Sequence, residues 1–290
     1  MIILAHSSKP AMHRFYKKIL LFLCAVCCTF TGCKNKGHEQ QPEIAVANSY
    51  LHAVVTDLCG DQQQILSLVP PGMCPGHFDI SPSQVSRLCN CKILLVFDFQ
   101  QNIEKIIPRI KDRGLKVCKI MPSPGLCIPD TYFSIVKQVA TALSEENPAK
   151  KTHYELRLRE IEKRLESTSQ EIVGRMEQSG LHNTNIIVSQ HQTEFVKWLG
   201  LNPVSTFAGR DTVTPAQINL NLQKAEQNQI ELIIANEQEG TELAQALAQH
   251  LKVKLVVFSN FPLSNQQNDM LAGFDGLVYE NVNNLLEAME

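Results

Sequence analysis

A cysteine and a histidine stand three positions apart in a proline- and glycine-rich stretch of the sequence, SLVPPGMCPGHFDISPSQ (residues 67–84). At this spacing the thiolate of Cys74 and the imidazole of His77 can bind one metal ion, with a Zn–S distance of about 2.3 Å and a Zn–N distance of about 2.0 Å. A stiff loop also lowers the entropy cost of ordering the two ligands. Two other roles stay open: Cys74 can form a disulfide with Cys127 in an oxidising compartment, and His77 can cap the helix that follows.

Further candidate ligands each follow a run of residues typical of a β-strand. They are Cys127 after residues 116–121, His191 after residues 185–190, and Glu237 and Glu239 after residues 231–236. Ligands bind beyond the carboxyl ends of parallel strands, so these residues should share one cleft with Cys74 and His77 if two such sheets oppose each other. Either glutamate can instead be a solvated carboxylate at the start of a helix, stabilised by the helix dipole.

The chemistry of these donors ranks the possible cations. If Cys74 binds the ion, thiolate and imidazole favour Zn²⁺, leave copper or Fe²⁺ open, and disfavour Mn²⁺, which prefers oxygen ligands. If Cys74 is oxidised, two histidines with carboxylates leave Mn²⁺ and Fe²⁺ open. Zn²⁺ is therefore the predicted ion, with Mn²⁺ or Fe²⁺ as the alternatives.

The elements that must position these residues are short apolar runs that alternate with helical patterns from residue 43 onward. Runs such as KILLVFD (92–98) lack polar alternation, which indicates strands covered on both faces and hence parallel sheets with crossover helices. In residues 148–178 the apolar positions recur at three- and four-residue steps, which predicts one helix of about 30 residues.

We therefore predict an α/β fold in which two four-stranded, Rossmann-like parallel-sheet lobes are joined by one long backbone helix. The predicted divisions are a signal peptide at 1–32, a tether at 33–42, an N-terminal lobe at 43–147, the linker helix at 148–180 and a C-terminal lobe at 181–290.

The N-terminus has the features of an export signal. Basic residues precede an apolar stretch from Ile19 to about Phe30, which is short for a bilayer span. The stretch ends in FTGC, which is similar to the lipobox of bacterial lipoproteins and predicts a lipid on Cys33. A transmembrane anchor is the alternative, because the polar segment after Cys33 suits a tether equally well. We expect a protein outside the cytoplasm, anchored to a bacterial membrane in the periplasm or at the cell surface.

Three stretches together resemble the zinc/manganese-binding family of ABC-transporter solute-binding lipoproteins. They are SLVPPG…DISPSQVSRL, ATALSEENPAKKTHYELRLREIEKRL and VSQHQTEFVKWLGL, and the resemblance runs from about residue 43 to the end of the chain. It implies one divalent ion held between two lobes by histidines and an acidic residue, and delivered to an ABC permease and its ATPase.

Carried over residue by residue, the resemblance matches His191 to one ligand of the family. His77 is shifted by one residue from the position of the family's first histidine ligand. The family's second histidine falls near residues 124–127, and its late aspartate falls at Ser259 or Asn260. Two of the usual ligands are therefore replaced in this chain, which bears on the identity of the metal more than on the fold.

The predicted function is that of a monomeric, extracytoplasmic solute-binding lipoprotein of an ABC importer that carries Zn²⁺ as cargo. The alternative is a binding protein for a chelated metal, haem or a cobalamin-like ligand, since a chelated metal needs fewer protein donors. A metallohydrolase is less favoured, because the sequence contains no H-E-x-x-H or G-x-S-x-G motif. We therefore expect that the protein is not an enzyme. The formal net charge of −2 gives no indication of nucleic-acid binding.

Overall fold

The computed structural model describes residues 42–70, 80–100, 103, 105, 108, 114–209, 213–262 and 272–290. The chain divides into two units, Met1–Gln40 and Gln41–Glu290, and the description below concerns the second. The predicted signal peptide, Cys33, Cys74 and His77 lie outside the described residues.

The first sheet is built from short apolar strands that are all parallel. Its strands are β1 (Ile44–Val46), β2 (Ile65–Ser67), β3 (Ile93–Phe97) and β4 (Lys116–Ile120), in the order β2-β1-β3-β4. Every residue of β3 is buried, as expected for a central parallel strand covered on both faces.

The second sheet repeats this arrangement. Its strands are β5 (Asn185–Ser189), β6 (Asn202–Phe207), β7 (Leu232–Asn236) and β8 (Lys254–Phe258), in the order β6-β5-β7-β8, again all parallel. The predicted α/β fold with two four-stranded parallel sheets is thus confirmed.

Helices cover the sheets, and short polar side chains cap the start of some of them. They are α2 (Ser49–Cys59), α3 (Pro82–Leu88), α6 (Pro129–Glu146), α7 (Lys151–Gln178), α8 (Thr193–Trp198), α9 (Pro215–Asn228), α10 (Glu242–Leu251) and α11 (Gly273–Met289), with 3₁₀ turns η2 (Pro148–Lys150), η3 (Gln190–Gln192) and η4 (Glu237–Glu239). Asn48 caps α2, and capping boxes start α3 and α9. These caps satisfy backbone N–H groups that have no partner within the helix.

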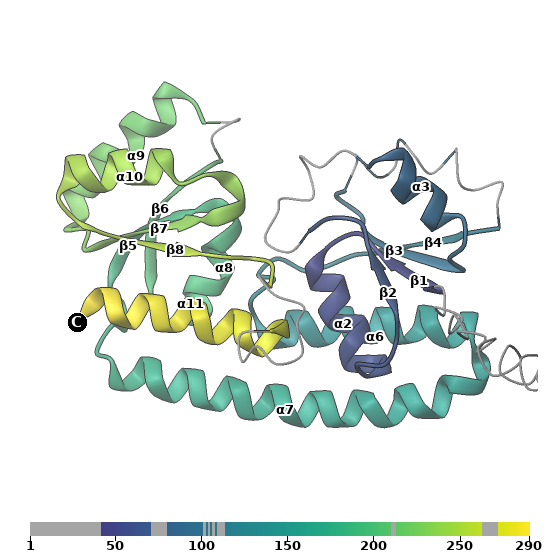
Figure 1. Cartoon of the computed structure of the whole chain (residues 1–290). Helices are drawn as coiled ribbons and strands as arrows, with labels where there is room; N and C mark the ends of the chain where they lie inside the picture. The colour runs from purple at the N-terminus through teal and green to yellow at the C-terminus, as the bar shows by residue number, and fades with distance from the viewer. Residues whose placement is uncertain are drawn as a thin grey trace, which may run out of the picture. The chain divides into compact units, whose positions relative to one another are not determined.

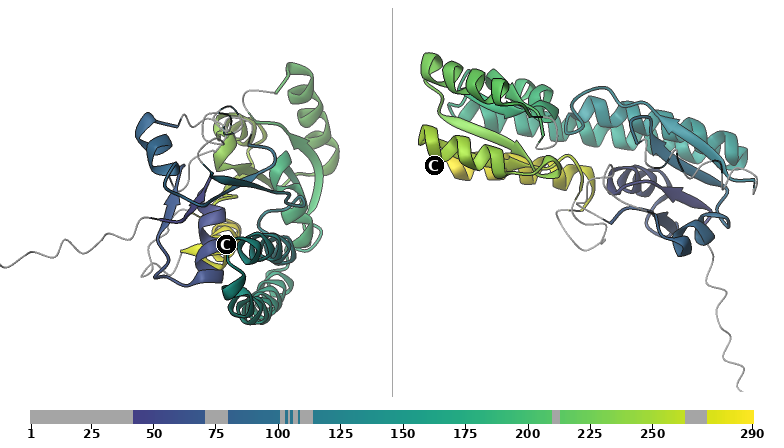
Figure 2. Two further views of the ribbon diagram at one scale, coloured as in Figure 1. Left: turned by 90° about the vertical axis from the view of Figure 1, so that its right-hand side faces the viewer. Right: turned by 90° about the horizontal axis from the view of Figure 1, so that it is seen from above.

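Helix α7 is the long helix that the sequence predicts, with 28 residues. It runs along one side of both sheets, with α2 and α6 between it and the first sheet and α11 between it and the second (Figure 1; Figure 2). Its buried side chains recur at helical spacing and form one stripe: Tyr154, Ile161, Leu165, Thr168, Ile172 and Met176. We refer below to the first sheet with α2, α3 and α6 as the first lobe, and to the second sheet with α8, α9 and α10 as the second lobe.

The two lobes share one hydrophobic core. A continuous cluster of buried residues includes both sheets, α7 and the C-terminal helix α11. The ring of Phe274 at the start of α11 stacks on Tyr132 of α6, with ring centroids 4.1 Å apart. The lobes are therefore joined by α11 as well as by α7. Within the part of the chain that the structure describes, no helix has the length and hydropathy needed to cross a membrane.

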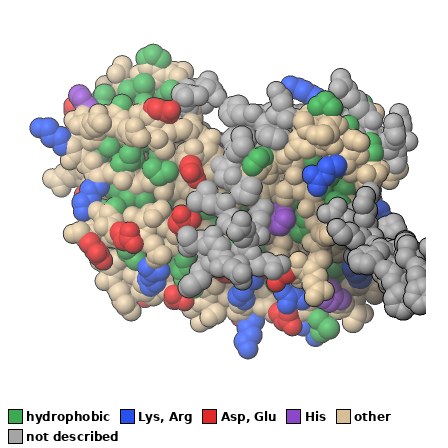
Figure 3. Space-filling view, viewed as in Figure 1, with side chains coloured by type: hydrophobic (Ala, Val, Ile, Leu, Met, Phe, Trp, Pro, Cys, Tyr) green, Lys and Arg blue, Asp and Glu red, His purple; other side chains and the backbone are tan. Residues whose placement is uncertain are grey.

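Charged side chains are mixed by sign on the face shown in Figure 3. Basic residues stand singly among acidic ones there, rather than gathering into one patch. The described basic side chains on this face therefore do not form the clustered surface that nucleic-acid-binding proteins present.

Candidate functional site

The shared strand order places a topological switch point in each sheet. The chain leaves β1 toward β2 on one side and returns as β3 on the other, and β5, β6 and β7 repeat the pattern. The connections that follow the two central strands then diverge and open a crevice at their carboxyl ends, where ligands bind in such sheets. In the second sheet, η3 follows β5 and η4 follows β7, so the crevice lies between η3 and η4.

This crevice holds a histidine–carboxylate–hydroxyl chain. His191 of η3 donates a hydrogen bond from Nδ1 to Oε1 of Glu239, and Ser189 donates its hydroxyl proton to the other carboxylate oxygen. With Nδ1 occupied as a donor, the lone pair of a neutral His191 is on Nε2. A carboxylate behind an imidazole in this way is the usual support of a metal-binding histidine.

The hydrogen bond to Glu239 raises the pKa of His191 above its ordinary value, while burial works in the other direction. Burial by itself would raise the pKa of Glu239, but hydrogen bonds from His191 and Ser189 outweigh it and lower that pKa. The His191 side chain is 67% exposed and that of Glu239 only 15%, so the histidine is the member of the pair that a ligand can reach from the solvent.

Gly209 holds Glu239 in place from the side of β6. A Cβ atom at this position would stand 3.1 Å from Cβ and 3.3 Å from Cγ of Glu239. A side chain at position 209 would therefore require Glu239 to shift by a few tenths of an ångström.

A cleft of about 440 Å³ lies next to His191, between the lobes. Its first-lobe wall is Phe99 with residues 122–126, and its second-lobe wall includes His191, Glu194 and Asn260. The lobes touch here, because a Cβ atom on Gly125 would meet Cβ of Glu194 at 3.2 Å.

The other predicted ligands have different surroundings. The thiol of Cys127 is fully buried, and it donates hydrogen bonds to the carbonyl of Ser259 at 3.2 Å and to Oδ1 of Asn260 at 3.5 Å. Burial raises the pKa of this thiol, which keeps it protonated. Glu237 is exposed, accepts a hydrogen bond from Gln238, and does not line the cleft. Within the described ranges, no three His, Cys, Asp or Glu side chains form a metal-binding group.

Sequence reasoning missed a buried amide network beside the cleft. The Gln192 side chain donates to Oδ1 of Asn260 at 3.2 Å and to Oδ1 of Asn236 at 3.4 Å, and Asn281 accepts from the backbone of Ser259. The available signal is the polar residue that ends an apolar strand, as in IIAN and VVFSN. Phe99, on the other wall, gave no chemical signal in the sequence.

The sequence of the chain matches the model of one known protein family. Residues 128–288, more than half of the sequence, match the family model described as ZnuA, zinc-uptake complex component A, periplasmic. The chain belongs to the ZnuA family. The resemblance seen in the sequence is thereby confirmed. No curated protein sequence matches the chain at a significant level.

Solved structures with the same architecture include other periplasmic metal-binding proteins. A ZnuA crystal structure is similar with a TM-score of 0.68 at 17% identity, over 85% of this chain and 98% of its own. A metal-free mutant of the periplasmic metal-binding protein from Candidatus Liberibacter asiaticus has a TM-score of 0.71 at 12% identity, over 85% of this chain and 99% of its own. At these identities the likeness establishes the fold shared with the ZnuA family.

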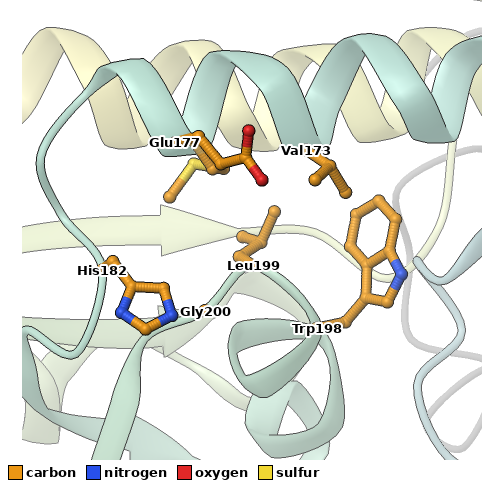
Figure 4. A pocket seen from close by; sticks show the side chains of 7 residues that line it. Val173, Glu177, His182, Trp198, Leu199 and Gly200 are labelled. Atoms are coloured by element: carbon orange, nitrogen blue, oxygen red, sulfur yellow. The ribbon is translucent and has the colours of Figure 1, made fainter.

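A second hollow of about 210 Å³ lies between α7 and the second lobe (Figure 4). Glu177 and His182 stand on opposite sides of it, and Trp198 closes one end. His182 precedes β5, so this hollow lies at the amino-terminal edge of the second sheet. Ligand sites of such sheets lie at the opposite edge, and the interlobe cleft is therefore the candidate site of this ZnuA-family chain.

Proposed function

We propose that this ZnuA-family chain captures a divalent cation in the interlobe cleft outside the cytoplasm and delivers it to an ABC permease and its ATPase. The observation that carries the proposal is His191, which is exposed at a topological switch point and supported by Glu239. Zn²⁺ is the proposed cargo, because an imidazole supported by a carboxylate suits zinc. Similar solved structures include manganese-bound and cadmium-bound forms of one periplasmic metal-binding protein, which supports Mn²⁺ as an alternative. Fe²⁺ is the other alternative, on the chemistry of the donors alone.

The remaining donors of the proposed site are Cys74 and His77, on the strength of their spacing alone. Glu239 takes a supporting role behind His191 in this proposal. Cys127 and Glu237 are assigned no contact with the cation, because the first is buried against Ser259 and the second is exposed away from the cleft lining. We propose a monomer, since both walls of the interlobe cleft come from one chain.

Zinc titration at two pH values tests the proposal. Full-length protein should bind one Zn²⁺ at pH 7.5, and affinity should fall at least about tenfold at pH 5.5 because protons compete for the imidazole. Glu239 raises the pKa of His191, so the loss should begin at a higher pH than for an unsupported histidine. Glu194, the other acid of the cleft lining, is paired with Lys197. Calorimetry that shows no zinc binding, or a pH-independent affinity, would contradict the proposal.

The proposed anchor is a lipid on Cys33, and it has its own test. Cells that express the full chain and are fed labelled palmitate should transfer label to the protein, and Cys33→Ser should abolish the transfer. The variant should then move from the membrane fraction to the soluble fraction. A variant that stays in the membrane without label would support a transmembrane anchor instead.

A further inference from the structure

The cleft beside His191 is much larger than a bare cation needs. A divalent ion with ligands at about 2.0–2.6 Å occupies little more than the roughly 30 Å³ that one water molecule takes in the liquid. The cleft measures about 440 Å³, which lies within the range of roughly 300–1,000 Å³ typical of small-molecule sites.

Its two walls differ in chemistry. The second-lobe wall is polar, with His191, Glu194 and Asn260, whereas the first-lobe wall is formed by Phe99 and the Pro122–Leu126 segment. The ring of Phe99 is stacked on the buried ring of Phe97 with centroids 5.2 Å apart, yet 52% of the residue is exposed. An aromatic ring held from behind and open in front is a platform for another flat group.

The apolar wall is held by hydrogen bonds from helices α2 and α6 of the first lobe. The side chain of Gln138 bonds both the N–H and the carbonyl of Met121, each at 3.0 Å, at the start of the segment. The hydroxyl of Tyr50 donates to the carbonyl of Leu126 at 2.7 Å, at its end. The wall is therefore preformed, and it would have to break these bonds to collapse onto a bare ion.

The floor of the cleft is also fixed, because the lobes already touch there. Gly125 packs against Glu194, and the thiol of Cys127 is bonded to Ser259 of the second lobe. Further closure at these points would bring packed atoms into collision, so these contacts oppose a collapse of the cleft onto a bare ion.

We propose that the cleft binds its metal as a complex with a small, flat organic chelator. This inference rests on the proposed function, and it names the form in which the cargo arrives. His191 binds the metal through Nε2, the ring of the chelator lies on Phe99, and the chelator's own donor atoms take the coordination positions that the protein's donors leave open. The class is a divalent ion held by an aromatic nitrogen–oxygen chelator, and no bond is made or broken other than metal–ligand bonds.

Calorimetry with pyridine-2-carboxylate tests this inference, using full-length protein freed of metal. Zn²⁺ should bind about two- to tenfold more tightly as its 1:1 complex with this chelator than alone, the gain expected from one aromatic stacking contact. Piperidine-2-carboxylate, which has the same donor types on a saturated ring, should give no gain. A chelator that only competes with the protein for Zn²⁺ would lower the apparent zinc affinity. Binding of the complex therefore raises this affinity, and competition lowers it.

Variants of Phe99 locate the contact. Phe99→Ala and the similarly sized Phe99→Leu should lose the gain, which is the ratio of the affinities measured with and without chelator for the same variant. Leu156→Ala is the matched control, since Leu156 is 53% exposed on α7 and outside the cleft lining. Zn²⁺ binding that the chelator weakens, or a gain that survives both Phe99 variants, would overturn the inference and leave the proposed function standing. Protein that binds zinc neither alone nor with chelator would overturn both.

Discussion

Replacing His191 with alanine should weaken zinc binding by at least about a hundredfold. The imidazole is the exposed donor at the switch point of the second sheet, and Glu239 holds its ring orientation. Loss of a supporting carboxylate alone typically costs about 10–100-fold in metal affinity, and loss of the ligand itself should cost more. Calorimetric titration of His191→Ala, Glu239→Gln and the unaltered chain should therefore give three affinities in that order, weakest first.

His182→Ala is the matched control for this series. His182 is also an exposed histidine of the second lobe, but it lies at the amino-terminal edge of the sheet beside α7 (Figure 4). Its variant should bind zinc as the unaltered protein does. Equal losses from both histidine variants would mean that zinc binds to the surface non-specifically, and an unchanged His191→Ala would remove His191 from the site.

The fold followed from the sequence because its signals are local and repeated. Buried parallel strands require unbroken apolar runs such as ILLVF, and a helix that packs along one stripe requires the spacing seen in α7. The C-terminal helix α11 has a weaker local signal, and it starts at Gly273. Two glycines lower the helix propensity of its first turns, and the burial of Phe274 against Tyr132 overrides that preference.

The candidate site was predictable only in part. The rule that ligands bind at strand ends pointed to both His191 and Glu239, and the structure brings these two side chains together. The sequence could not distinguish Glu239 from Glu237, because both stand in the same 3₁₀ turn, η4. The local geometry of this turn determines which carboxylate faces the histidine. It also gave no sign that Cys127 is buried against Ser259, since that contact joins residues 132 positions apart.

An ion cluster under the lobes links them to α7. Arg164 of α7 forms a bidentate pair with Asp57 of α2, and its Nε lies 2.9 Å from Oδ2 of Asp275 in α11. Tyr132 and Thr168 donate hydrogen bonds to these two carboxylates at 2.7 Å and 2.9 Å. One guanidinium therefore neutralises acids from helices that pack on different sheets, and it links these helices to α7.

Arg164→Met should lower the free energy of unfolding by about 2–3 kcal/mol. Breaking a fully buried pair costs about 3–5 kcal/mol and an exposed one about 0–1 kcal/mol, and these side chains are 38%, 18% and 26% exposed, between the two limits. For a chain of this size the melting temperature should fall by about 4–10 °C. The cost arises mainly because Asp57 and Asp275 stay half-buried without a counter-charge.

Thermal unfolding followed by circular dichroism measures this effect. Lys92→Met is the control, because its pair with Glu43 joins side chains that are 58% and 57% exposed and should leave the melting temperature unchanged. Asp275→Asn in the Arg164→Met background should recover part of the loss, since it removes one unpaired carboxylate. Equal melting temperatures for Arg164→Met and Lys92→Met would show that the cluster does not join the lobes, and the angle between them would then depend on the shared hydrophobic core alone.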